Sequence, residues 1–361
     1  MTGLAERLRK SLAFEGPMPL SRFLALAMAE RSAGYYTTRD PLGAAGDFTT
    51  APEISQCFGE LVGAALAQAW LDRGAPAPVR LVELGPGRGT LLLDAFRATQ
   101  RVADFHRAIE LHLVEASPVL RALQAERLAA FAPRFHDRLE TVPEGRPLLL
   151  IANEFFDVLP IRQFVRTADG WRERLVAADE HGRLGFVLAP HALSLPELGT
   201  DLREGTVVEL SPARAALACE IGRRIAAAGG LALLVDYAKV GAVGDSLQAV
   251  RGHRRADPLE EPGNVDLSSR VDFDALARAA RTQGAAVFGP IGQGAFLERL
   301  GIRARLARLA AGRPEPVARA LAAGVRRLVD PEEMGTLFRV LAVTRSGEPV
   351  PPGFEPQELA A

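Results

Sequence analysis

The chain has 361 residues, of which 48% are hydrophobic and 24% are charged, with 43 basic against 44 acidic residues. The resulting net charge of -1 argues against unspecific binding to a nucleic-acid backbone, and no apolar run approaches the roughly 20 residues that span a bilayer. Two cysteines, Cys57 and Cys219, are too few for a disulfide-stapled secreted domain. We therefore expect an enzyme-sized cytoplasmic protein without a membrane segment.

The first 75 residues predict a helical N-terminal cap. Apolar residues recur at helical spacing over 3–13 and 20–31. A loop rich in glycine and threonine follows over 34–53, and a long helix is expected from there to about residue 72. We interpret the loop as a cover for a ligand site.

Residues 76–345 predict a Rossmann-like α/β domain. Buried strands are expected at 79–84, 111–115, 148–152 and 231–236, with helices between them. Strands and helices in alternation are typical of a parallel sheet.

Two insertions interrupt this domain, at about 161–204 and 239–270. The first holds three short alternating segments separated by Asp169-Gly170 and His181-Gly182, which predicts an antiparallel β-meander. The second is polar and irregular. Helices at about 272–281 and 294–328 form a C-terminal elaboration, a strand follows at 337–344, and the proline-rich tail 346–361 is expected to be disordered.

A glycine loop joins the first strand of this domain to a helix. Gly85, Gly87 and Gly89 leave the backbone bare where it must turn and approach a ligand, and Pro86 lies between them. Their spacing is not the G-x-G-x-x-G of dinucleotide sites. With Glu83 upstream, the loop instead resembles the first motif of class I S-adenosylmethionine-dependent methyltransferases. The alternative is a tight turn without a cofactor.

Glu115 ends the next strand at the carboxyl edge of the sheet. A carboxylate there typically accepts hydrogen bonds from ribose hydroxyls. The alternative is that Glu115 only caps the following helix through Ser117.

Asn153, Glu154 and Asp157 follow the strand at 148–152. Two carboxylates three residues apart can face the same way on a helical turn, where both can grip one cation or one guanidinium. The alternative is that the polar groups only terminate backbone while their apolar neighbours pack.

The loop near residue 47 supplies further polar groups. Asp47 is a candidate partner for the ammonium of the methionine moiety, and Thr49 or Thr50 for its carboxylate. An Asx turn and a helix cap explain the same residues equally well. The six histidines lack the spacing of metal ligands, so no metal is expected.

Several blocks together resemble the MidA-like class I methyltransferases, a family that includes a mitochondrial complex I assembly factor acting on protein arginine. The resemblance covers about 34–344, and its blocks are Gly34-Tyr-Tyr36, Arg39–Gly43, Gly46–Gln56, Phe58–Leu61, Leu81–Thr90, Glu154–Pro160, Val235–Tyr237, Val271–Phe273 and Gly289–Gln293.

The resemblance implies S-adenosyl-L-methionine as methyl donor and a protein arginine as acceptor, with a subunit of respiratory complex I as the candidate protein. Glu154 and Asp157 would then hold the guanidinium as the catalytic pair. The cofactor would be held by Glu83, Gly85, Pro86, Gly87, Gly89, Glu115, Asp47, Thr49, Thr50 and Asn153.

The chain also departs from this family, at Asn153, where the mitochondrial form has histidine, and over Ser246–Gly252. Both differences fall on the acceptor side. Two alternatives stay open at this point: an assembly protein that binds the cofactor without essential catalysis, and a nicotinamide-dependent oxidoreductase, which the glycine spacing disfavours.

Overall fold

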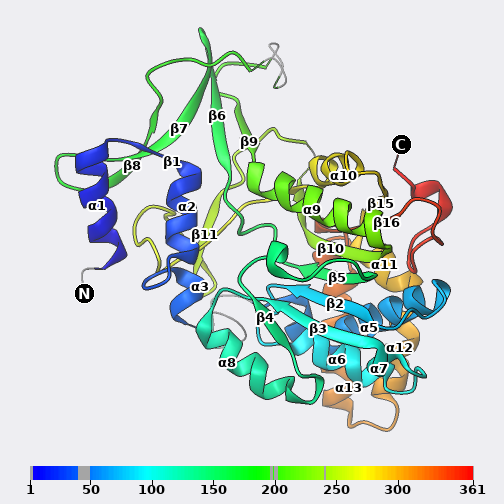
Figure 1. The fold of residues 1–361 in the computed structure, drawn as a ribbon. Coiled ribbons are helices and arrows are strands. Elements are labelled where there is room, and N and C mark those ends of the chain that lie inside the picture. The colour runs from blue at the N-terminus through cyan, green and yellow to red at the C-terminus, as the bar shows by residue number, and fades with distance from the viewer. Residues whose placement is uncertain (1–2, 40–48, 196–197, 199–201, 240, 361) are drawn as a thin grey trace.

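A computed structural model of the chain describes residues 3–39, 49–195, 198, 202–239 and 241–360 (Figure 1). At its centre lies an eight-stranded sheet of order β15-β16-β10-β5-β2-β3-β4, with β14 paired to β10. The strands from β4 to β10 run parallel, whereas β16 is antiparallel to both of its neighbours. The strands are β2 (Val79–Leu84), β3 (Ile109–Val114), β4 (Arg134–His136), β5 (Leu148–Asn153), β10 (Gly230–Lys239), β14 (Val271–Asp272), β15 (Ala285–Gly292) and β16 (Phe338–Arg345). This sheet confirms the expected Rossmann-like fold.

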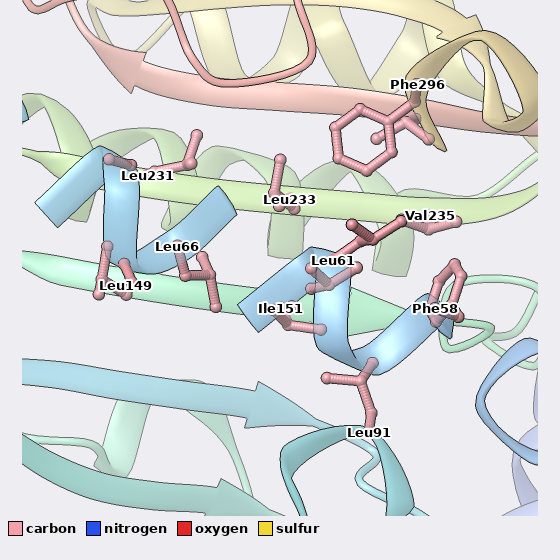
Figure 2. Close-up of a cluster of buried hydrophobic side chains, with 14 of the residues drawn as sticks. Phe58, Leu61, Leu66, Leu91, Leu149, Ile151, Leu231, Leu233, Val235 and Phe296 are labelled. Atoms are coloured by element: carbon pink, nitrogen blue, oxygen red, sulfur yellow. The ribbon is translucent and has the colours of Figure 1, made fainter. Parts of the chain in front are cut away.

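Helices cover both faces of the sheet, which is why its central strands are apolar without interruption. On β5, Leu149 and Ile151 face one layer of helices, whereas Leu148 and Leu150 face the other. Figure 2 shows the first layer, where Phe58, Leu61 and Leu66 lie over the sheet. That layer consists of α5 (Gln56–Asp72), α6 (Thr90–Thr99), α7 (Phe105–Ala108), α11 (Gln293–Arg299), α12 (Ile302–Ala310), α13 (Glu315–Val329) and α14 (Met334–Leu337). The opposite layer contains α9 (Pro212–Ala228) and α10 (Phe273–Arg281).

The inserted meander and the N-terminal helices form a second, smaller assembly. Strands β6 (Arg162–Thr167), β7 (Gly170–Ala178) and β8 (Leu184–Leu188) pair in sequence as antiparallel neighbours, as the turn signals predict. Strands β1 (Met18–Pro19) and β9 (Val207–Leu210) extend this sheet. Its helices, α1 (Leu4–Glu15), α2 (Leu20–Ala29) and α3 (Tyr35–Thr38), share a core with the meander rather than with the central sheet.

Several elements differ from the expectations. The long helix begins as α4 (Ala51–Ile54) and restarts at Gln56, because Ser55 leaves helical geometry and its Oγ accepts from the Cys57 backbone at 3.3 Å. Helix α5 belongs to the central core and not to the cap. Strands β4 and β15 had no counterpart in the sequence analysis, since β4 is three residues long and β15 contains Gly289-Pro290. The second insertion is not irregular throughout, since it forms a small sheet of β11 (Gln248–Arg251), β12 (Arg254–Ala256) and β13 (Asp266–Ser268).

The C-terminal tail is folded, contrary to the expectation of disorder. Phe354 is buried against Phe288 and Phe296, and the Ala360 backbone donates to the Val287 carbonyl at 2.8 Å. Glu348 forms a buried ion pair with Arg73 at 2.7 Å. The proline-rich composition of the tail predicted disorder, because it gives no indication of the few residues that anchor the tail to the core.

The remaining short elements are α8 (Pro118–Arg127), η1 (Ala129–Phe131), η2 (Leu139–Thr141) and η4 (Pro356–Glu358). None of the helices in the described ranges combines the length and the apolar character that a membrane span requires.

Candidate active site

A cavity of about 630 Å³ lies at the carboxyl ends of β2, β3 and β5, where open α/β sheets bind ligands. Its walls also include residues of α2, α3 and α4 and the turn after β4. Eight predicted site residues line it: Glu83, Gly85, Pro86, Gly87, Glu115, Thr50, Asn153 and Glu154. Gly89, Thr49 and Asp157 are not among its described lining residues, and Asp47 lies outside the described part of the chain.

The glycine loop requires glycine at three positions because Gly85, Gly87 and Gly89 have φ values of 61°, 54° and 73°. A Cβ at Gly85 would also approach the Phe155 ring to 2.6 Å. Gly89 lies at the N-cap of α6 and is therefore a conformational residue rather than part of the cavity wall. The loop leaves bare backbone along the cavity floor.

Two buried acids flank this loop. Burial and the nearby charge of Glu115 raise the pKa of Glu83 from its ordinary 4.5 to about 8, so Glu83 is protonated at neutral pH. Burial likewise raises the pKa of Glu115. Glu115 accepts hydrogen bonds from the Ser117 backbone at 2.8 Å and from Gln124 at 3.2 Å. It therefore caps the chain before α8 and also faces the cavity, so the two interpretations of Glu115 are compatible.

Glu154 has the most constrained backbone of the predicted acids. Its φ of 50° is in the left-handed region, which a glutamate rarely adopts. Its Oε1 accepts from the Ala51 backbone at 2.8 Å and from Asn153 Nδ2 at 3.1 Å. Burial raises the pKa of Glu154 to about 7. The carboxyl group is thus fixed in the cavity by a residue 103 positions earlier in the chain.

Asp157 does not join Glu154 in the cavity wall. The segment after Glu154 is a bend and turn rather than the helical turn assumed from the sequence. The backbone N–H groups of Phe155, Phe156 and Asp157 all donate to Asp236 Oδ2, at 3.1, 2.9 and 3.2 Å. Asp157 Oδ1 is buried without a hydrogen-bond partner in the described structure, and burial raises the pKa of Asp157 to about 6 despite the charge of Arg214.

The sequence analysis did not assign Asp236 to the site. Asp236 is fully buried within β10, and its Oδ1 also accepts from the Tyr237 backbone at 2.9 Å. Arg214 supports the same turn, because its guanidinium donates to the carbonyls of Phe156 and Asp157 at 2.7 and 2.9 Å. The sequence could have indicated Asp236, because it is the acidic last residue of the buried strand expected at 231–236.

The N-terminal segment reaches the cavity through α4. Thr50 precedes this helix, but its hydroxyl forms no capping bond, so the cap interpretation does not account for it. Glu53 was not predicted as a site residue, yet it lines the cavity and its Oε1 accepts from the Thr90 hydroxyl at 2.6 Å.

Acidic residues outnumber basic residues in the described cavity lining. Among its described lining residues, six carry carboxyl groups, Glu53, Glu83, Glu115, Asp137, Glu140 and Glu154, against two arginines, Arg88 and Arg138. Such a balance suits a cationic ligand. Across the described ranges, no three His, Cys, Asp or Glu side chains are grouped so that they could hold a metal ion.

Comparisons with known proteins give the cavity a chemical context. Residues 61–291 match a family model described as "Putative S-adenosyl-L-methionine-dependent methyltransferase". The chain is 36% identical to the mitochondrial protein arginine methyltransferase NDUFAF7 homolog of Drosophila melanogaster, over 94% of this chain and 84% of that protein. It is 35% identical to human mitochondrial protein arginine methyltransferase NDUFAF7, over 95% and 83%.

Solved structures agree with these sequence matches. A crystal structure from Burkholderia thailandensis with bound S-adenosyl-homocysteine superposes with a TM-score of 0.85 at 29% identity, over 99% of this chain and 96% of that chain. A native structure from the same organism gives a TM-score of 0.82 at 30% identity, over 98% and 94%. On these matches along nearly its whole length, the chain belongs to this family of S-adenosyl-L-methionine-dependent methyltransferases.

Proposed function

We propose that this methyltransferase modifies an arginine side chain of a protein, and that Glu154 contacts the guanidinium. The observation that carries the proposal is the fixed carboxyl group of Glu154 at the end of β5, held by Ala51 and Asn153. Relatives at 36% identity bear the name protein arginine methyltransferase, which supports the same acceptor.

The residues present fit the cofactor. The cavity volume is in the range of small-molecule sites, its floor is bare glycine backbone, and its excess of carboxyl groups complements a sulfonium with an amino-acid tail. The glycine loop would lie under the methionine part, and Glu115 would accept from the ribose. When bound, S-adenosyl-L-methionine would supply an electrophilic methyl group to a guanidinium nitrogen, and the proton lost by that nitrogen would pass to water.

Glu154 would serve this reaction by orientation and by charge. Its carboxylate would hold the guanidinium in line with the methyl group, and positioning of this kind is a large catalytic effect. Since burial raises the pKa of Glu154 to about 7, the carboxylate fraction of the free protein rises between pH 6 and 8. We expect the transfer rate to rise over the same interval.

Asp157 would act from behind the cavity rather than by direct contact. The Asp157 carboxyl group interacts electrostatically with Asp236 and Arg214, and both of these residues bind the turn that follows Glu154. We therefore propose one contacting carboxylate instead of the pair expected from the sequence. A subunit of respiratory complex I is a candidate acceptor protein, and the cytoplasmic location stays a prediction, since the named relatives are mitochondrial.

The test is methyl transfer from radiolabelled donor to proteins of a bacterial lysate, followed by hydrolysis and identification of the labelled amino acid. Labelled methylarginine is expected, and Glu154→Gln should reduce it at least tenfold, while Glu332→Gln, a charge-matched change at an exposed residue outside the cavity lining, leaves it within twofold. Label on another amino acid, or equal labelling by Glu154→Gln, would refute the acceptor assignment. Cofactor binding without any labelled protein would instead favour a binding and assembly role.

A further inference from the structure

We infer that Glu53 binds the α-ammonium of the cofactor's methionine moiety. This residue was expected only as part of a helix start, and nothing in the proposed acceptor chemistry requires it. The inference concerns cofactor binding alone, so it stands or falls independently of the arginine proposal.

The position of Glu53 in the cavity is the first reason. Glu115 and the lining residues Asp137, Leu139 and Glu140 lie at the β3 and β4 side, which is the expected adenosine side. Glu53 contacts Thr90, the first residue of α6 after the glycine loop. The methionine moiety would lie over that loop, so Glu53 would lie beside the amino-acid end of the ligand.

The second reason is that the Glu53 carboxylate is oriented by a hydrogen bond but has no basic side chain paired with it in the described residues. Thr90 Oγ1 accepts a hydrogen bond from Arg127 Nη1 at 3.3 Å, and its hydroxyl donates a hydrogen bond to Glu53 Oε1 at 2.6 Å. Within the described residues, Glu53 has no ion pair with any arginine, lysine or histidine. A half-buried carboxylate held in this way is ready to accept from an ammonium.

The other acids near the glycine loop are less suited to this contact. Glu83 keeps a proton at neutral pH because burial raises its pKa to about 8. One oxygen of Glu154 is already occupied by the Ala51 and Asn153 donors, and its position at β5 is on the acceptor side. Glu115 is bound by Ser117 and Gln124.

The test measures the affinities of three ligands by calorimetry: S-adenosyl-homocysteine, its analogue with the amino group replaced by hydrogen, and 5′-methylthioadenosine, which lacks the amino-acid tail. Glu53→Gln should weaken S-adenosyl-homocysteine by about tenfold or more, the loss expected for a hydrogen bond between charged groups. Binding of the other two ligands should change less than twofold. Thr90→Val should shift the same discrimination in the same direction by a smaller factor.

Binding of 5′-methylthioadenosine also reports whether each variant is folded. Glu140→Gln is the matched control and should affect S-adenosyl-homocysteine and 5′-methylthioadenosine equally. Equal weakening of all three ligands by Glu53→Gln, or unchanged affinity for S-adenosyl-homocysteine, would overturn the inference. So would a loss of the ammonium discrimination in Glu83→Gln but not in Glu53→Gln.

Discussion

Glu83→Gln should stabilise the free protein, and increasingly so as the pH rises. Glu83 is 3% exposed, and its pKa is raised from 4.5 to about 8 by burial and by Glu115. Between these values the unfolded chain releases the proton while the folded chain keeps it. The free energy of unfolding of the wild type therefore falls as the pH rises from about 4.5 to 8, and a glutamine, which does not titrate, removes that loss.

The size of the effect follows from the shift. Each pH unit above 4.5 costs the folded wild type about 1.4 kcal/mol, so the advantage of the variant grows from about 1 kcal/mol at pH 5 to about 3 kcal/mol at pH 7. With an unfolding entropy of about 0.8 kcal/mol per kelvin for a chain of this length, 3 kcal/mol corresponds to roughly 4 °C in melting temperature. Groups that titrate equally in both proteins cancel from the difference.

The assay is thermal melting of wild type, Glu83→Gln and Glu140→Gln across pH 5 to 8, without ligand. Glu140→Gln, at an exposed residue, is the control for the loss of one carboxyl group from the cavity. The difference in melting temperature between Glu83→Gln and wild type should widen as the pH rises. If it stays constant or narrows, Glu83 is ionised in the folded protein and burial does not raise its pKa as stated.

Three other changes probe the loop, the turn and the tail. Gly85→Ala should destabilise the fold by about 2 kcal/mol and abolish measurable binding of S-adenosyl-homocysteine, because the new Cβ would require a φ of 61° and approach Phe155 to 2.6 Å. Thermal melting measures the loss of stability, and calorimetry measures the loss of binding. Asp236→Ala should reduce methyl transfer at least tenfold more than it reduces S-adenosyl-homocysteine affinity, because it leaves the three N–H groups of the turn without their acceptor. Asp236→Asn keeps an acceptor oxygen and should recover part of the transfer rate. Glu348→Gln should cost about 3 kcal/mol in a denaturant titration, because Arg73, with a side chain 7% exposed, would lose its buried partner; an unchanged midpoint would contradict this.

The fold and the cavity residues that follow β2 and β3 were predictable because both follow from local signals. Apolar strands in alternation with helices predicted the parallel sheet, and three glycines after a buried strand predicted the turn in which Gly85 and Gly87 line the cavity. The acceptor side was not predictable in the same way. No local sequence pattern predicts a glutamate at φ 50°, and the turn held by Asp236 leaves Asp157 outside the described cavity lining.

Contacts distant in sequence account for the other differences. The contact from Ala51 to Glu154 spans 103 residues, and Glu53 meets Thr90 across 37, so neither leaves a pattern in its own segment. The tail was misjudged for a related reason. Its composition is that of a disordered segment, but Phe354 and Glu348 find partners in the core that only the tertiary fold supplies.

Helix α4 connects the C-terminal elaboration to the cavity. A Cβ at Gly324 of α13 would come within 2.9 Å of the Ile54 carbonyl, so α13 approaches α4 as closely as the backbone allows. The same four-residue helix also presents Ala51 to Glu154 and Glu53 to Thr90. Because so short a helix is not stable alone, its position depends on what packs against it. The C-terminal helices thus hold the segment that fixes Glu154 and presents Glu53 to the cavity, which gives this elaboration a direct part in shaping the site.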